Sequence, residues 1–444
     1  MNLIYGIKDK PKFGQMLLFA FQQVLAILAA TILVPAIIGN GMSQSAALLG
    51  AGVGTIVYQL FTKFKSPVFL GSSFAFINSM FAAFAGAASA SAGYAGIILG
   101  AVFAGLVYVV IAIVVKLVGV NWINKLMPPV VIGPTVALIG LSLAVNAVND
   151  LKVGKVMVDG VSAASPYVTL ICGLVTLFSI FAISVYGKKM MKLIPFVLGI
   201  LAGYIVATIF TVIGIATDNV ALQVINFAAF KEMTLFAIPD FSFIEAMKGV
   251  KEIDGAFIAT VAVAYVPVAF VVFAEHIADH KNLSTIIGSD LLEEPGLHRT
   301  LLGDGIGSIA GALFGGCPNT TYGESVGCVA ITRNASVITI TTAAIMCIVI
   351  SFFGPFVAFL DSIPGCVMGG VCITLYGFIA VSGLKMIQKV DLNQNKNLFV
   401  VASILIPGIG GMALAIGKVT LTAVACALIL GIIVNLMLSK AKEE

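Results

Sequence analysis

Three acidic side chains lie in or beside stretches of this sequence that carry almost no other charge. Glu275 follows a run of twenty uncharged residues, and Asp279 comes four positions later, so that both carboxylates would lie on one face of a helix. Glu324 ends a short segment that begins with Cys317 and Pro318. A charged residue in an apolar segment indicates a functional role, because its burial in lipid is costly. No lysine or arginine lies in a nearby segment to pair with Glu275 or Glu324. We expect these carboxylates to bind a polar ligand or to carry protons.

Two histidines accompany the acids. His276 and His280 are four residues apart, a spacing that can ligate a metal, but the sequence offers no third ligand and no glutamate at the metalloprotease position. We therefore expect no metal, and we predict that His276 belongs to a hydrogen-bond relay with the acids. Asp304 lies in a glycine-rich apolar segment, where a structural hydrogen bond is the better interpretation.

Two short segments have the pattern of interrupted membrane helices. Residues 65–76 contain a proline followed by β-type and small residues, and residues 317–324 repeat this pattern about 252 positions later. We interpret each as an extended stretch that leads into a half-helix. Unwound backbone persists in a membrane only beside protein or a water-filled cavity. The N-terminus of each half-helix would offer free N–H groups and a partial positive charge to ligand oxygens.

These groups together indicate the chemistry of the ligand. Carboxylates beside backbone N–H groups place hydrogen-bond acceptors and donors side by side, and Phe74, Phe76 and Tyr322 would supply apolar walls. Such a site suits a planar, neutral molecule with alternating N–H and C=O groups. It does not suit an anion, which would need arginine or lysine at its centre.

The composition places these residues in a membrane. The chain has 444 residues, of which 60% are hydrophobic and 10% are charged, and its mean hydropathy is +1.12. Soluble domains carry about 25% charged residues, so a soluble, disordered or nucleic-acid-binding protein is excluded. Long continuous apolar runs exclude an outer-membrane barrel. The seven cysteines have apolar surroundings and no C-x-x-C pair, so we expect neither a disulfide framework nor a zinc site. The fold class is all-α integral membrane.

About fourteen membrane spans of roughly 20 residues fit the chain. With the N-terminus inside, 18 basic residues fall on the cytoplasmic side and 6 fall outside, as the positive-inside rule requires. We expect a multi-pass protein of the cytoplasmic (inner) membrane with both termini inside and residues 216–254 as an outer loop between two halves. The expected spans are 14–38, 43–62, 66–86, 94–116, 125–148, 165–186, 191–215, 255–279, 300–315, 318–332, 335–354, 358–384, 397–416 and 419–438.

The two halves of the chain resemble each other. Residues 48–61 and 301–314 are identical at eight of fourteen positions at a constant offset of 253, and residues 127–133 echo residues 363–369. Glycine-rich helices give chance matches, but two matches in the same order are harder to dismiss. With seven spans in each half, the second half is inverted relative to the first. This is the architecture of secondary transporters, whose substrate site lies where the halves meet.

Three segments resemble a known family. Residues 319–333 strongly resemble the signature of the nucleobase–ascorbate transporter family. Residues 274–277 and 71–76 look like the matching segments of its bacterial uracil permease branch, and the resemblance covers nearly the whole chain. It implies uptake of a nucleobase, uracil foremost, driven by the proton gradient, with the proton as coupling ion and no cofactor.

The resemblance also implies an architecture and a set of site residues. A core domain (1–120 and 255–356) would move like an elevator against a gate domain (121–254 and 357–444), and the family suggests a homodimer through the gate. Glu275 and Glu324 would bind ring N–H groups, and the backbone amides of Phe74 and Gly323 would bind carbonyls. Carried over by position, the substrate-binding residues are Glu275, Glu324, Phe74, Gly323, Tyr322, Ala30 and Ser73, and the proton-coupling residues are Glu275, Asp279, His276 and Glu324.

Two positions depart from the uracil permease pattern. Ser325 stands after Glu324, where the signature usually has asparagine. Asp279 stands four positions after Glu275, where the best-known uracil permease has histidine. Acids at that position are familiar among the xanthine and urate transporters of the family, so a purine proton symporter is the alternative. The Glu-His-Ile context and an acid at Glu324, where many purine members have glutamine, favour uracil.

Three other classes of protein compete with a nucleobase carrier. An anion exchanger resembles the same inverted-repeat fold, but such proteins usually carry a large soluble C-terminal domain, whereas this chain stops at Glu444. A channel would need rings of site residues in an oligomer. A membrane enzyme would need a nucleophile–base pair, and Ser72, Ser73 and Thr320 have no histidine at a plausible spacing. We therefore expect a transporter and not an enzyme.

Overall fold

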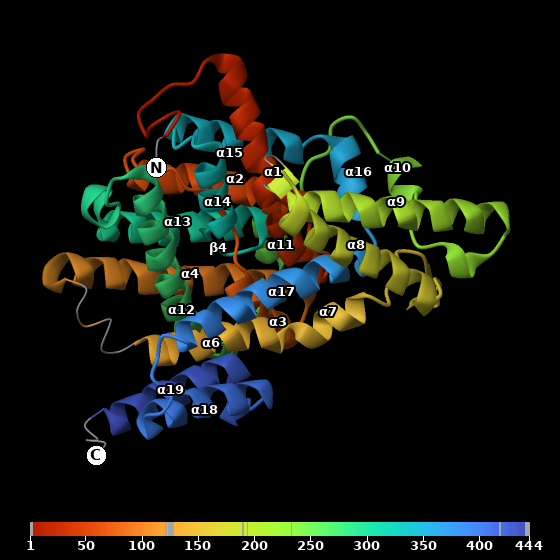
Figure 1. The fold of residues 1–444 in the computed structure, drawn as a ribbon. Helices are drawn as coiled ribbons and strands as arrows, with labels where there is room; N and C mark the ends of the chain where they lie inside the picture. Colours follow the sequence, from red (N-terminus) through yellow and green to blue (C-terminus); the bar gives the residue numbers. More distant parts are fainter. Residues whose placement is uncertain are drawn as a thin grey trace.

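Helices make up most of the chain (Figure 1). The computed structural model describes residues 3–119, 122, 128–188, 191–192, 194–231, 233–416 and 419–439. Within these residues, seven helical segments are long and apolar enough to cross a membrane. They are α1 (Phe13–Ile38), α4 (Ala90–Val118), α6 with α7 (Pro129–Ser142 and Ala144–Asp150), α8 (Pro166–Tyr186), α9 (Pro195–Ala216), α12 (Gly255–Ile287) and α17 (Gly365–Ile387).

Shorter elements complete the fold. The other helices are α2 (Gln44–Phe61), α3 (Ile77–Ala85), α10 (Ala228–Lys231), α11 (Ser242–Gly249), α13 (Leu297–Gly315), α14 (Gly323–Thr332), α15 (Val337–Ser351), α16 (Gly354–Ser362), α18 (Asn395–Ile409) and α19 (Ala423–Leu438). Single turns of tighter or wider helix cover Phe74–Phe76, Val220–Leu222, Val250–Glu252 and Leu292–Gly296. The strands are β1 (Leu70–Ser72), β2 (Met157–Val158), β3 (Val161–Ser162), β4 (Asn319–Thr321), β5 (Leu414–Ile416) and β6 (Val419–Leu421).

The two interrupted segments have the predicted form and pair with each other. Strands β1 and β4 run antiparallel, with Gly71 opposite Thr320, and each leads into a short helix, β1 through the turn Phe74–Phe76 into α3 and β4 into α14. The Ser73 N–H donates to Pro318 O at 2.8 Å. The extended backbone thus finds its hydrogen-bond partners within the protein, as a membrane interior requires.

The repeated glycine-rich segments lie in α2 and α13, which pack against each other along their lengths. A Cβ atom added to Gly50 would lie 2.5 Å from Gly311 O, and one added to Gly54 would lie 2.7 Å from Gly307 O. Only glycine permits this approach of the two backbones, and small residues serve the same purpose in other membrane helix pairs. The internal repeat therefore brings its two copies into direct contact.

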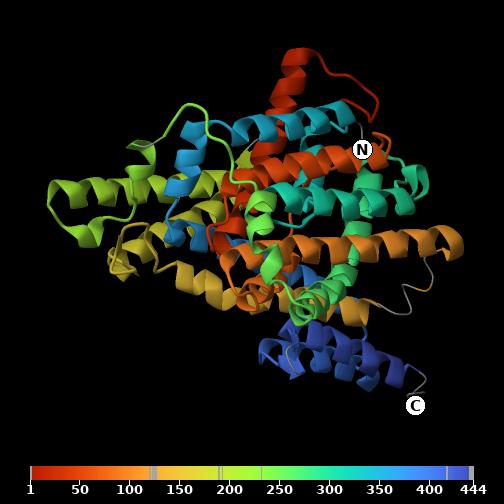
Figure 2. The same ribbon diagram turned by 180° about the vertical axis from the view of Figure 1, so that it is seen from behind.

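The long helices form two packed groups (Figures 1 and 2). In the first helix group, α1–α4 pack with α12–α15; α13, for example, lies against both α2 and α4. In the second helix group, α6–α9 pack with α17–α19; α17, for example, lies against α6, α7 and α8. The pair α18 and α19 lies at the bottom edge of both views, on the side of α6 away from α2.

Several predicted span boundaries differ from the structure. The predicted span 358–384 is wrong at its start, because α16 ends at Ser362 and α17 begins only after Pro364, whose missing N–H suits a helix start. The predicted span 397–416 ends early, since α18 stops at Ile409 and a short β5–β6 hairpin follows. Helix α12 extends past 279 to Ile287, and the first residues of the predicted span 125–148 lie outside the described residues.

The close approach of α2 and α13 predicts the effect of a single added methyl group. Gly50→Ala should lower the thermal unfolding midpoint in detergent, because overpacking costs about 1–3 kcal/mol while alanine gains helix propensity of about 1 kcal/mol. Gly377→Ala in α17 is the matched control, since nothing lies within 4 Å of an added Cβ there. Equal midpoints for the two variants would show that the close contact of Gly50 with α13 does not determine the stability of the protein.

Candidate functional site

A cavity of about 370 Å³ lies between the two helix groups, within the range of small-molecule sites. It is bounded on one side by polar residues of the first helix group and on the other by mostly apolar residues of the second. The first helix group contributes Ser73, Phe74, Ala75, Ala274, Glu275, Ala278, Asp279, Thr320, Thr321, Tyr322, Gly323 and Glu324. The second contributes Ile132, Val136, Ile139, Leu375, Phe378, Ile379, Ser382 and Met386.

Three carboxylates converge on this cavity. Glu275 and Asp279 come from one face of α12, and Glu324 comes from the first turn of α14; all three are half-buried. Asp279 Oδ2 accepts a hydrogen bond from Thr321 Oγ1 at 3.1 Å. No lysine or arginine is among the lining residues that the structure describes. The cavity therefore presents hydrogen-bond acceptors and negative charge without a cation beside them.

Hydrogen-bond donors reach the cavity from the two half-helices. The turn that begins at Phe74 follows β1, and α14 begins at Gly323 directly after β4. The first N–H groups of a helix have no partner within the helix, so the amides of Phe74 and Gly323 are available to a ligand. The pairing of β1 with β4 holds both N-termini at the same cavity.

Tyr322 and Gly71 fit together beside the cavity. The Tyr322 hydroxyl donates to Ser72 O at 2.8 Å, and a Cβ atom on Gly71 would lie 2.3 Å from the Tyr322 ring. Glycine is therefore required at this position of β1 for the tyrosine to lie against the strand. Of the aromatic wall expected from the sequence, Phe74 and Tyr322 line the cavity, whereas Phe76 is buried outside the lining and stacks on Tyr265.

Most of the predicted site residues meet at this cavity, and two do not. Ser73, Phe74, Tyr322, Gly323 and the three carboxylates line it. Ala30 is buried in α1 and is not among the lining residues. His276 lies on the other face of α12, where its Nδ1 lies 2.7 Å from Asp304 Oδ2. Asp304 thus has the structural hydrogen bond that its glycine-rich surroundings indicated.

Sequence reasoning missed two parts of the site. Thr321, which donates a hydrogen bond to Asp279, lies inside the signature segment, where its hydroxyl is a signal of a polar contact. The wall formed by Phe378 and Ser382 of α17 gave no signal, because these residues read as one ordinary face of an apolar helix.

Ser325 is a buried connector outside the lining of the cavity. Its Oγ accepts a hydrogen bond from the Phe69 N–H at 2.9 Å and another from Gln23 Nε2. The side chain is fully buried. Ser325 thus joins α14 to α1 and to the residue before β1.

The fold is that of a membrane transporter domain. It is similar to the transmembrane domain of a cyanobacterial bicarbonate transporter, BicA, with a TM-score of 0.59 and 15% identity over 97% of this chain and 99% of that one. It is also similar to the murine Solute Carrier 26 family member A9 anion transporter, with a TM-score of 0.63 and 11% identity over 97% of this chain and 69% of that one. At these identities the likeness concerns the fold alone.

Sequence comparison places the chain more narrowly. Residues 14–417 match the model of a permease family. The chain is 36% identical to the uracil permease of Bacillus subtilis, over 99% of this chain and 96% of that protein, and 39% identical to that of Bacillus caldolyticus, over 98% and 94%. It is 33% identical to the uracil permease of Escherichia coli K12, over 97% and 93%. The chain belongs to this family, the nucleobase–ascorbate transporters, and is a multi-pass membrane permease.

The position of Ser325 predicts a loss of stability on truncation. Ser325→Ala should lower the thermal midpoint, because the buried Phe69 N–H and Gln23 amide would lose their acceptor at about 1–3 kcal/mol each. Ser403→Ala is the control, since its hydroxyl bonds only Val400 O of its own helix. A variant as stable as the control would contradict the role of connector.

Proposed function

We propose that this protein takes up a nucleobase, uracil foremost, together with protons across the cytoplasmic membrane. The observation that carries the proposal is the convergence of three carboxylates and two half-helix N-termini on one cavity without a cation. Relatives named uracil permeases support the substrate class. The absence of arginine and lysine from the described cavity lining argues against an anion.

The polar edge of a nucleobase matches the polar wall of the cavity. In the proposed complex, Glu275 and Glu324 accept hydrogen bonds from ring N–H groups, and the amides of Phe74 and Gly323 donate to ring carbonyls. Phe74 and Tyr322 give the ring apolar surfaces, and Ser73 lies beside them. Because a carboxylate can only accept, this arrangement selects rings that present N–H groups on both sides of a carbonyl.

The two helix groups would supply the moving and static parts of the carrier. In this proposal the first helix group is the core domain and the second is the gate domain, each built from both halves of a fourteen-span inverted repeat. The core carries the three carboxylates and the two half-helix N-termini, and the gate contributes a mostly apolar wall that includes Ser382. An elevator movement of the core against that wall would expose the same cavity to each side of the membrane. In this proposal both termini lie in the cytoplasm, and the protein forms a homodimer.

Proton coupling would reside in the carboxylates of the cavity. Like charges that share a cavity repel, and a proton on one of them relieves the repulsion. Asp279 is well placed for this, because its Oδ1 lies 3.8 Å from where a Cβ on Gly323 would be, beside the first turn of α14. We assign the proton to Glu275, Asp279 and Glu324, and we assign His276 to the buried side of the same helix.

Asp279 is the residue that makes a purine the alternative substrate. It faces the cavity from the position where, by the family resemblance, the best-known uracil permease has a histidine, and a second acceptor there suits the further N–H groups of xanthine or urate. Ser325 gives no support to a purine, because it lies outside the cavity lining. Competition between substrates separates the two candidates.

Uptake by proteoliposomes tests the proposed function. Labelled uracil should accumulate under an imposed inward proton gradient, and excess unlabelled uracil should block it. Collapse of the gradient should abolish accumulation. Inhibition by xanthine or urate but not by uracil would assign the protein to the purine alternative, and uptake that is indifferent to the gradient would contradict proton coupling.

Removal of one acceptor tests the proposed binding mode. Glu275→Gln should weaken uracil binding on the order of 10- to 100-fold, because the amide presents an N–H toward a ring N–H and a charge-assisted hydrogen bond is lost. Isothermal titration measures the effect. Glu293→Gln on the exposed surface is the matched control. Equal affinities of the two variants would remove Glu275 from the site.

A further inference from the structure

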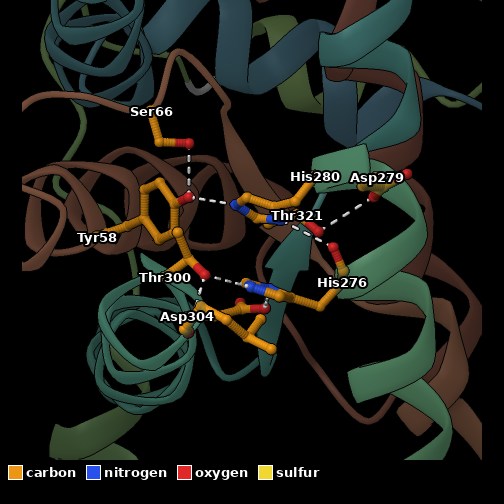
Figure 3. A network of polar contacts seen from close by, with 9 residues as sticks. Tyr58, Ser66, His276, Asp279, His280, Thr300, Asp304 and Thr321 are labelled. Carbon is orange, nitrogen blue, oxygen red and sulfur yellow. Dashed lines mark hydrogen bonds and ion pairs between the residues drawn. The ribbon is translucent and has the colours of Figure 1, made fainter. Parts of the chain in front are cut away.

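Each cavity acid of α12 is followed by a histidine that faces the other way. Glu275 and Asp279 line the cavity, whereas His276 and His280 are buried against α13 and α2 on the back of the helix (Figure 3). The two imidazole rings are stacked, with their centroids 4.0 Å apart. The proposed function uses the acids and leaves the histidines and their partners without a role.

His280 begins a chain of hydrogen bonds whose donors depend on the charge of the ring. Its Nδ1 lies 2.8 Å from His276 O, which can only accept, so Nδ1 carries a proton. Its Nε2 lies 2.7 Å from the Tyr58 hydroxyl, which lies 2.7 Å from Ser66 Oγ. If Tyr58 donates to Ser66, its oxygen must accept from a protonated Nε2, and His280 is positively charged. If His280 is neutral, Tyr58 must donate its one hydrogen to Nε2, and its donation to Ser66 is lost.

The second histidine is held in a different manner. Thr300 Oγ1 donates its only hydrogen to Leu297 O at 3.0 Å, so it must accept from His276 Nε2 at 3.0 Å. His276 Nδ1 and Asp304 Oδ2 then share one proton across 2.7 Å. Because the two rings are stacked, a positive charge on both is disfavoured. The variable proton of the network is therefore the one on His280 Nε2.

We propose that His280 is a proton-binding residue of the transport machinery, that its charge favours the ionised form of Asp279, and that Tyr58 and Ser66 connect it to the cytoplasmic end of the core domain. This inference rests on the proposed proton symport. Ser66 is buried directly beside Lys65, whose ammonium pairs with Glu294 at the surface. Loss of the coupled proton from Asp279 into the cytoplasm would be easier with a positive charge at the next residue.

We assign the change of charge during transport to His280 and not to the other titratable groups around it. They are Tyr58 from α2, Asp304 from α13, Glu324 from α14, and Glu275, His276, Asp279 and the exposed Lys281 from α12 itself. The cavity acids lie on the opposite face of α12, and the Asp304 proton is shared with His276. Within the described residues, no lysine or arginine forms an ion pair with any of these groups.

Dependence of uptake on internal pH tests the inference. Net uracil uptake by wild-type proteoliposomes should decline as the internal pH falls, because proton release into the lumen slows. His280→Gln cannot take the positive charge, and Tyr58→Phe leaves a protonated Nε2 without an acceptor. In both variants the internal pH at which uptake falls to half should move upward by roughly one pH unit, the size of effect that a nearby charge produces. Tyr204→Phe in α9 of the second helix group is the matched control, because its hydroxyl lies 2.7 Å from Ser362 Oγ of α16.

A second transport mode separates this role from packing. Counterflow of labelled against unlabelled uracil at equal pH needs no net proton release, so it should stay within about twofold of wild type in both variants. Profiles that superimpose on wild type, or an equal loss of uptake and counterflow at every pH, would overturn the inference. Uptake by the wild type that ignores the gradient would instead overturn the symport itself, and the inference with it.

Discussion

The structure depends on one constraint, which is that extended backbone in a membrane interior must find its hydrogen-bond partners within the protein. Neither β1 nor β4 could satisfy this alone, since each is a three-residue strand between apolar helices. Their antiparallel pairing supplies the missing partners, and it also aims the N-termini at Phe74 and Gly323 into one cavity. The candidate site therefore lies where the two halves of the chain meet.

Glycines bring the two strands within reach of their supporting helices. Because α2 and α13 approach so closely, the Asn319 amide fits between them and donates from Nδ2 to Gly50 O at 3.1 Å. On the other strand, the Leu70 N–H donates to Thr55 Oγ1 of α2 at 2.9 Å. A Cβ on Gly54 or Gly311 would occupy the place of the Asn319 amide. The repeated glycine motif thus acts on the site by positioning β1 and β4.

Much of this arrangement could be predicted from the sequence, because its signals are local. A proline-led polar segment, a carboxylate after twenty apolar residues and a repeated glycine motif each show within a few positions, and the strand plus half-helix form, the converging acids and the family were predicted from them. The break at Pro364, the hairpin after Ile409 and the α17 wall of the cavity were not. Proline and glycine mark the first two places, but only packing between distant segments decides where each helix resumes and which face of α17 meets the cavity.

Helix α12 shows how a membrane protein accommodates two adjacent pairs of an acid and a histidine. Side chains one position apart point about 100° apart on a helix, so an acid followed by a histidine places one on each side. The acids face the cavity, and the histidines face α2 and α13, where Tyr58, Thr300 and Asp304 bind three of their nitrogen atoms; the fourth, His280 Nδ1, donates to His276 O. Each polar group thus has its own means of avoiding lipid. In the proposed mechanism, a change of charge on His280 acts on the cavity acids across the width of this helix.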